Sequence, residues 1–270
     1  MYLINGILHT MASDVIRDGF VSFEHGKITA VGRMDELQLP EQAEVLDVTG
    51  CHIYPGLVDA HSHLGMFGDS LGFESDDGNE ITDPVTPQLR AIDAINPFDR
   101  CFQEAREGGV TTVVTGPGSA NAIGGQMAAI KTVGRRVDDM ILRAPVAMKF
   151  ALGENPKSCY NDRHETPITR MATAALIREE LFKAREYLEK KDRAAADEDA
   201  DAPEFDLKLE ALIPVIRGEL PAHFHAHRAD DIATAVRIAK EFGLSMINDN
   251  HCDLIWGVAG NAGNGAAEAA

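Results

Sequence analysis

The chain has 270 residues, of which 44% are apolar and 25% are charged, so it can bury a large core and does not have the composition of a disordered protein. A formal net charge of −18 argues against nucleic acids and anionic membranes as partners, because both are bound by clustered lysine and arginine. The sequence shows neither an apolar run of about 18 residues nor a leader pattern, and its four cysteines form no C-x-x-C pair, which together predict a reduced, cytoplasmic protein.

The first 54 residues alternate short apolar runs with turn signals, among them Asn5-Gly6, Asp18-Gly19 and Thr49-Gly50. Stretches typical of β-strands lie between the turns, at 20–23 and 27–32. We therefore predict that residues 1–54 form a small antiparallel β-segment, the first domain of the chain.

An apolar stretch beginning at Leu57 follows the turn Pro55-Gly56 and ends in His61 and His63. Because side chains two residues apart on a strand point to the same side, both imidazoles can face one metal ion at the end of that strand. The apolar residues predict a strand that is buried in a parallel sheet. A His-x-His pair by itself is weak evidence for a metal, since ordinary half-buried strands also carry such pairs.

Residues 65–97 are rich in Gly, Asp, Pro and Asn and predict a long loop, followed by a helix at 99–107 and a buried strand at 110–115. Helix, glycine and strand in this order are typical of a parallel α/β barrel. The glycine-rich residues 116–126 match no phosphate-binding motif, so we interpret them as a substrate loop rather than as a nucleotide or sugar site.

A single charged side chain, Lys149, lies within the apolar run 144–152 of the next predicted strand. Burying an ammonium group is costly unless it is paired or chemically modified, which makes Lys149 a candidate functional residue. A polar turn at 153–157 is expected to close this strand. Further along, 168–191 has the pattern of a long amphipathic helix, and the acidic residues 192–206 predict a solvated loop.

Histidine recurs at alternate positions of a further predicted strand, 221–227, as His223, His225 and His227. On an extended strand all three would lie on one side, although surface histidines also cluster by chance. An amphipathic helix that reaches Phe242 follows, and then a strand at 244–250 that ends at His251.

The order of these residues, with the pattern P-G-hydrophobic-hydrophobic-D-x-H-x-H at 55–63, resembles the amidohydrolase superfamily, in particular its imidazolonepropionase-like and prolidase-like members. The resemblance implies an α/β fold with an incomplete (β/α)8 barrel of TIM type over residues 55–252, and it makes residues 1–54 part of a small β-sandwich. Residues 253–270 form a low-complexity tail outside the resemblance. The implied function is hydrolysis of an amide, cyclic amide or dipeptide-like C–N bond by a metal-activated water.

The resemblance also implies a set of metal ligands, namely His61, His63, Lys149, His225 and His251. Lys149 would be carboxylated, so that a carbamate supplies oxygen ligands, and Glu154 is the alternative ligand if one ion is bound. His225 is preferred because it fits the family pattern with Ala226 and Ile232, which leaves His227 and Arg228 as substrate contacts and His223 as a surface residue. One or two divalent ions are expected, with zinc favoured although iron, manganese and cobalt also fit. The expected partner is a small amide-type molecule, and homo-oligomerisation stays open.

The family's general-base aspartate at the end of the eighth strand has no counterpart that we can identify, and no strand–helix unit is predicted after residue 252. We therefore expect a C-terminally truncated barrel with two open sheet edges. Two functions follow from this sequence. The chain is either a metal-dependent amidohydrolase or an inactive fragment that retains metal binding or an interaction role.

Overall fold

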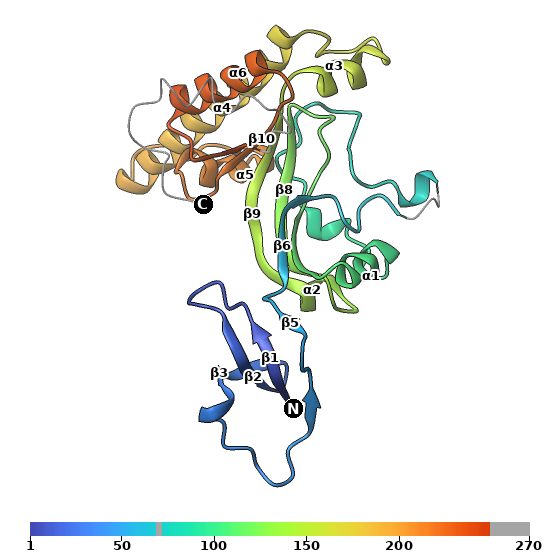
Figure 1. Cartoon of the computed structure of the whole chain (residues 1–270). Helices are drawn as coiled ribbons and strands as arrows, with labels where there is room; N and C mark the ends of the chain where they lie inside the picture. The colour runs from blue at the N-terminus through green and yellow to red at the C-terminus, as the bar shows by residue number, and fades with distance from the viewer. Residues whose placement is uncertain (69–71, 249–270) are drawn as a thin grey trace. The chain divides into compact units, whose positions relative to one another are not determined.

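The computed structural model describes residues 1–68 and 72–248 of the chain, which divides into two compact units, Met1–Leu57 and Val58–Ala270 (Figure 1). The predicted tail, 253–270, lies outside the described residues. In the part of the chain that is described, no helix is both long enough and apolar enough to cross a membrane.

The first unit is built around one five-stranded sheet in the order β3-β2-β1-β4, with β5 also pairing with β1. Its elements are β1 (Tyr2–Leu8), β2 (Ile16–Glu24), β3 (Lys27–Arg33), the 3-10 helix η1 (Met34–Glu36), β4 (Val45–Asp47) and β5 (His52–Ile53). β2 and β3 form a hairpin whose two turn residues, His25 and Gly26, both have positive φ, as a tight hairpin turn requires. The predicted antiparallel segment is thus present in part, because β4 and β5 run parallel to β1. Residues 1–57 form one sheet, so the β-sandwich of which they would be a part stays a prediction.

The second unit contains a six-stranded mixed sheet in the order β11-β10-β9-β8-β7-β6. The strands are β6 (Leu57–Ser62), β7 (Val110–Thr115), β8 (Ile123–Lys131), β9 (Ile141–Ala151), β10 (Ala222–His225) and β11 (Met246–Asn248). β9, β10 and β11 run parallel to one another, whereas β8 is antiparallel to both β7 and β9. The long strands β8 and β9 bend along their length, so that the sheet curls like half of a barrel (Figure 1).

β8 corrects the prediction that residues 116–126 are only a loop. Gly124 and Gly125 suggested a loop, but both lie within β8, where most residues are buried. Gly125 has a φ of +129°, and a Cβ there would lie 2.7 Å from the Leu89 carbonyl oxygen, so glycine is required by a close backbone approach. The strictly parallel alternation that we expected is therefore interrupted by one antiparallel strand.

Six α-helices accompany this sheet in the described residues. They are α1 (Arg100–Glu107), α2 (Val137–Met140), α3 (Glu154–Asn161), α4 (Arg170–Ala196), α5 (Leu207–Ile216) and α6 (Ala229–Phe242), and two 3-10 helices, η2 (Phe73–Ser75) and η3 (Ala91–Asp93), lie in the predicted loop 65–97. α1 begins at its Asp99 cap, and α6 ends at Gly243 in the left-handed conformation. α3 is a correction, since a polar turn was predicted there. α4 continues into the stretch predicted as a loop because its alanines favour helix.

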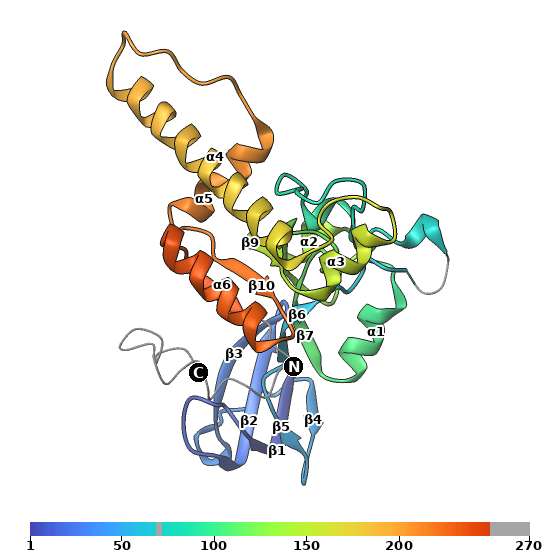
Figure 2. The same cartoon turned by 90° about the horizontal axis from the view of Figure 1, so that it is seen from above.

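Besides a small cluster of Tyr187, Leu188 and Ile213, two extensive hydrophobic clusters hold the unit together. The larger one packs β9 and β10 against α4, α5 and α6 (Figure 2). Within it the rings of Phe150 and Phe224 are stacked, with their centroids 4.8 Å apart. The smaller one lies between β7, β8 and α1 and includes the buried Phe102. β6 differs from our expectation of a buried strand, because Leu57 and Val58 are 59% and 65% exposed. β6 ends the sheet order, so one of its edges has no neighbouring strand among the described residues.

Candidate metal centre

Three histidines from two distant strands come together on the curled sheet. His61 lies on β6, His63 follows it at the strand's end, and their rings are 5.0 Å apart and nearly perpendicular. The ring of His223 on β10 lies 4.9 Å from that of His61. In a flat sheet β6 and β10 would be about 19 Å apart, four strand spacings, so the curl brings these imidazoles together.

Lys149 belongs to the same layer of the sheet as His223. The register of β9 and β10 places Lys149 directly opposite His223, and that of β8 and β9 places it opposite Gly125. Side chains in register on neighbouring strands project to the same face. The lysine is completely buried, and its Cγ packs near Gly124, where a Cβ would lie 3.5 Å away, an ordinary packing distance. We call His61, His63, Lys149 and His223 the inner cluster.

The orientation of His63 is fixed by the neighbouring strand. Its Nδ1 lies 2.7 Å from the carbonyl oxygen of Gly116, and because a carbonyl only accepts hydrogen bonds, Nδ1 carries the proton. The lone pair is then on Nε2. Around it, the Ser62 hydroxyl donates to the Val114 carbonyl and the Thr115 hydroxyl to the Leu64 carbonyl, which ties the end of β6 to β7. A backbone acceptor that sets the tautomer is typical of metal-binding histidines.

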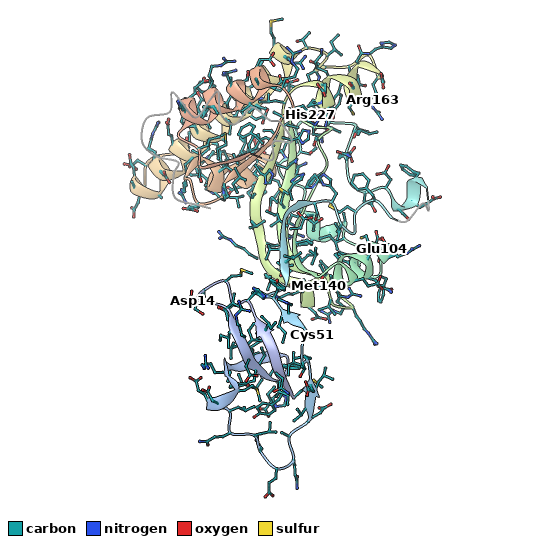
Figure 3. The ribbon with its side chains drawn as sticks, in the orientation of Figure 1. Asp14, Cys51, Glu104, Met140, Arg163 and His227 are labelled. Carbon is teal, nitrogen blue, oxygen red and sulfur yellow. The ribbon has the colours of Figure 1, made fainter. Side chains whose placement is uncertain are left out.

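A second group of polar residues lies one step further along β10, at the rim of the sheet. His225 is 7% exposed, and its Nε2 lies 3.1 Å from Nδ2 of Asn155. His227 donates from Nδ1 to Oε1 of Glu154 at 2.8 Å, and the rings of His225 and His227 are 4.5 Å apart. We call Glu154, Asn155, His225 and His227 the rim cluster. Figure 3 shows His227 at one end of the long strands and Met140 at the other.

An ion pair between Arg170 and the buried Asp231 lies next to the rim cluster. The Arg170 guanidinium donates to both carboxylate oxygens of Asp231, at 2.8 and 3.2 Å, and its Nη2 lies 3.7 Å from Oε2 of Glu154. The Asp231 side chain is only 4% exposed. It fits against Gly153, where a Cβ would lie 2.4 Å from Asp231 Oδ2. The backbone before Glu154 is thereby held close to α6.

The geometry of the inner cluster suits a metal ion in its ligand types and spacing. Two imidazoles bound to one tetrahedral ion through bonds of about 2.0–2.1 Å have ring centroids roughly 5 Å apart, as here. Within residues 1–68 and 72–248, however, no group of three or more His, Cys, Asp or Glu side chains could hold a metal ion by itself.

No family model matches the chain. Comparisons with other sequences and with solved structures did find similar proteins. The amidohydrolase tasK of Hapsidospora irregularis is 34% identical over 253 residues, which are 86% of this chain and 26% of tasK. Imidazolonepropionase of Bacillus cereus is 46% identical over 56 residues, 21% of this chain and 13% of that enzyme. The crystal structure of an amidohydrolase from Thermotoga maritima MSB8 superimposes with a TM-score of 0.85 at 43% identity, over 92% of this chain and 63% of that one.

The chain belongs to the amidohydrolase superfamily. The resemblance seen in the sequence is thus confirmed. The chain spans about a quarter of the length of tasK and 63% of the Thermotoga maritima chain.

The structure brings some of the predicted amidohydrolase ligands together and separates others. His61 and His63 lie in the inner cluster with Lys149, whereas His225 lies at the rim. His251 lies outside the described residues. Glu154 contacts His227 rather than the inner cluster, and Arg228 pairs with Asp230 at 2.9 Å in an exposed position.

Sequence reasoning missed two features of this site. His223 is 2% exposed and contacts His61, so it is not a surface residue. The alternation of the three histidines did place His223 and His225 on one side, but which of them faces β6 depends on strand register, which the sequence does not encode locally. Asn155 was also missed, because α3 was not predicted.

A cavity of about 290 Å³ adjoins the outer side of His63. Its lining includes Phe67, Asp99, Cys101 and Glu104, the last labelled in Figure 3. Burial raises the pKa of the Cys101 thiol to about 11. Cys101 is therefore a protonated, weakly nucleophilic group at neutral pH.

Proposed function

We propose that the chain is a metal-dependent amidohydrolase that cleaves the C–N bond of a small amide, cyclic amide or dipeptide-like substrate. The proposed ligands are His61, His63 and a carboxylated Lys149, with His225 as the expected ligand from β10 and His251 beyond the described residues. Zinc is the proposed ion, in one or two copies. The observation that carries the proposal is the approach of the His61, His63 and His223 rings in the layer that contains Lys149.

A divalent ion in such a site lowers the pKa of a bound water and polarises a scissile carbonyl. The residues of this chain have supporting roles. Gly116 holds His63 in the tautomer that presents Nε2, and Glu154 does the same for His227 through Nδ1. His227 thus offers a basic nitrogen at the rim, where a substrate would enter, and we assign it a substrate contact together with Arg228.

The surroundings of the two candidate acidic ligands favour Lys149 over Glu154. One oxygen of Glu154 accepts from His227 and the other lies near Arg170, so this carboxylate is already compensated. Lys149 is buried next to the histidines, where conversion of the ammonium to a carbamate would remove a buried positive charge.

The first test is the metal content per chain of the purified 270-residue protein, measured by plasma mass spectrometry after loosely bound ions are removed. Two ions per chain would support a binuclear site with carboxylated Lys149, and one ion would support a mononuclear site. A folded protein that binds no zinc would contradict the proposal.

Variants then assign the ligands. Lys149→Met is expected to lower the metal content and to abolish a carbamate signal from ¹³C-labelled bicarbonate. Lys131→Met is the matched control, because Lys131 is an exposed lysine on β8. Comparing His223→Asn with His225→Asn decides which β10 histidine binds the ion, since the expected ligand is His225 although His223 is closer to His61.

Hydrolysis is tested with the zinc-loaded chain on a panel of N-acyl amino acids, lactams and dipeptides. Release of the amine product that disappears in Lys149→Met, but not in Lys131→Met, would support the proposed activity. Stoichiometric metal without hydrolysis of any of these compounds would favour the alternative, a chain that keeps metal binding or an interaction role without catalysis.

A further inference from the structure

A cleft of about 550 Å³ lies between the first turns of α4 and α6, away from the inner cluster. Leu152 and Ala174 contribute apolar surface to it. Arg170, Arg178 and Arg237 contribute positive charge, and Asp230 and Asp231 contribute negative charge. None of the four inner-cluster residues lines it. The volume is in the range of small-molecule sites, so the cleft can hold a ligand of metabolite size.

Three arginines in one cleft are unusual for a chain with 43 acidic and 25 basic residues. Arg170 and Arg178 stand on α4, and Arg237 stands on α6. The side chains of Arg170 and Arg178 are 30% and 31% exposed, so their guanidinium groups are partly held in place and partly accessible. Arginine presents a planar fork of N–H donors, which matches the oxygens of carboxylates and phosphates.

The carboxylates near the cleft are already occupied. Asp231 accepts two hydrogen bonds from Arg170, and Asp230 accepts two from Arg228. Glu241 accepts from Arg178, but only through Nε, at 2.7 Å. These contacts leave donor groups of Arg178 available within the described part of the chain.

Arg237 is the least compensated of the three cations. Among the described residues it donates a hydrogen bond from Nη2 to the Thr234 hydroxyl at 2.7 Å, and no carboxylate of that part of the chain pairs with it. Thr234 belongs to the second turn of α6, a helix of 14 residues whose positive dipole end lies at this cleft. Asp230 and Asp231 in the first turn of α6 offset this dipole, so Arg237 is the main source of positive charge on the α6 side of the cleft.

We propose that the α4–α6 cleft binds a small organic dianion, either a short dicarboxylate or a phosphate monoester. Arg178 and Arg237 would contact the charged oxygens, and the apolar surface of Leu152 and Ala174 would contact the carbon skeleton. A single inorganic ion would fill only a small part of about 550 Å³, which favours an organic ligand. The proposal does not depend on the hydrolase activity, because the lining contains no residue of the inner cluster.

The test is calorimetric titration of the full chain with succinate and, separately, with glycerol 3-phosphate, at constant chloride concentration. Saturable binding of at least one of them is expected, and the tighter one identifies the source of the charge as carboxylate or phosphate. Arg178→Gln and Arg237→Gln should each weaken binding about tenfold, the size of effect expected for a lost charge-assisted hydrogen bond. Circular dichroism checks that both variants fold.

Arg185→Gln is the matched control, because Arg185 also stands on α4 but lies over the ring of Phe182 at 4.7 Å and does not line the cleft. Its affinity for the dianion should stay within about twofold of the unmodified chain, as expected for a distant surface charge. Absence of saturable binding for both dianions, or equal weakening by Arg185→Gln, would overturn the proposal.

A second control separates this cleft from the metal centre. The double variant His61→Asn, His63→Asn should keep its affinity for the dianion even if it no longer binds zinc. Loss of dianion binding in that variant would place the ligand at the metal centre and would also overturn the proposal. Failure of the hydrolase assay, in contrast, would leave this result unaffected.

Discussion

The inner cluster and the rim cluster each contain one histidine of β10, His223 and His225 respectively, yet their surroundings differ. In the inner cluster, His63 is oriented by a backbone carbonyl and lies beside the ring of His61, while His223 lies opposite the buried Lys149. In the rim cluster, His227 is oriented by a carboxylate that itself lies near Arg170. His223 and His225 are thus only two residues apart on β10, yet one lies among imidazoles and the other lies beside a network of paired charges.

The difference indicates which cluster can take up a cation. A metal ion adds positive charge and needs lone pairs, which the inner cluster offers through imidazole nitrogens and, after carboxylation, through Lys149. At the rim, Glu154 already interacts with His227 and Arg170, and Asp231 is taken up by Arg170. Within the rim cluster, Glu154 is therefore less suited to binding the proposed ion than His225 is.

The largest expected effect is loss of metal when the inner cluster is removed. His61→Asn, His63→Asn should reduce bound zinc to the background level, because two ligands on one strand are lost together. His227→Asn is the rim counterpart and should keep the metal content of the unmodified chain. Plasma mass spectrometry measures both. Equal loss of zinc in the two variants would show that the two clusters do not differ in metal binding.

The next effect concerns the ion pair beneath the rim. Arg170→Gln leaves the Asp231 carboxylate buried without its partner, and we expect the free energy of unfolding to fall by about 3 kcal/mol, the low end for buried pairs because Arg170 is 30% exposed. Arg90→Gln removes a pair with Asp93 in which both side chains are more than half exposed, so it should leave the free energy of unfolding nearly unchanged. Urea unfolding compares them. Similar losses of unfolding free energy in both variants would show that the buried Asp231 does not depend on its partner more than an exposed carboxylate does.

The third prediction tests how well the pocket beside His63 is shielded. With its pKa raised to about 11, Cys101 should react with iodoacetamide at pH 8 about a hundredfold more slowly than a thiol of ordinary pKa, since the thiolate is the nucleophile. The rate should rise about tenfold per pH unit up to about pH 11. Because the folded pKa lies above the unfolded value of 9.0, the associated stability is present below pH 9 and is lost as the pH rises toward 11.

Peptide mapping by mass spectrometry gives the alkylation rate of each cysteine, with the exposed Cys51 as the internal reference. Modification of Cys101 as fast as that of Cys51 would mean that the pocket opens freely to solvent. The inner cluster would then be less shielded than its packing indicates.

Much of the site could be predicted because its signals are local. The alternation that puts His61 with His63 on one side of a strand, and the oddity of Lys149 in an apolar run, are visible in a few residues. The order of strands β6, β7, β9 and β10 followed from the same kind of pattern. These features depend on strand period and on burial, which the sequence encodes directly.

The remaining features depend on contacts between distant segments. β8 was missed because Gly124 and Gly125 suggest a loop, although here they allow the backbone near Leu89 to approach. α3 was missed because Pro156 suggests a turn, whereas proline is tolerated in a first helical turn. The burial of His223 is set by the register of β10 against β9 and by the curl that brings β6 near. Neither can be read from residues 221–227 alone.

The smallest expected effect tests the contact between Gly153 and Asp231. Gly153→Ala should lower the free energy of unfolding by about 2 kcal/mol, because φ is +82° and the new Cβ would lie 2.4 Å from Asp231 Oδ2. Gly218→Ala has a similar φ of +73° with nothing within 4 Å, and it should cost about 1 kcal/mol from backbone strain alone. In an Asp231→Ala background the carboxylate is gone, so Gly153→Ala should cost no more than Gly218→Ala. Urea unfolding of this double-mutant cycle isolates the contact. Additive losses would show that Gly153 is needed only for its φ and that its contact with Asp231 does not position the start of α3. The contact between Arg170 and Glu154 would then be the one that positions the rim cluster.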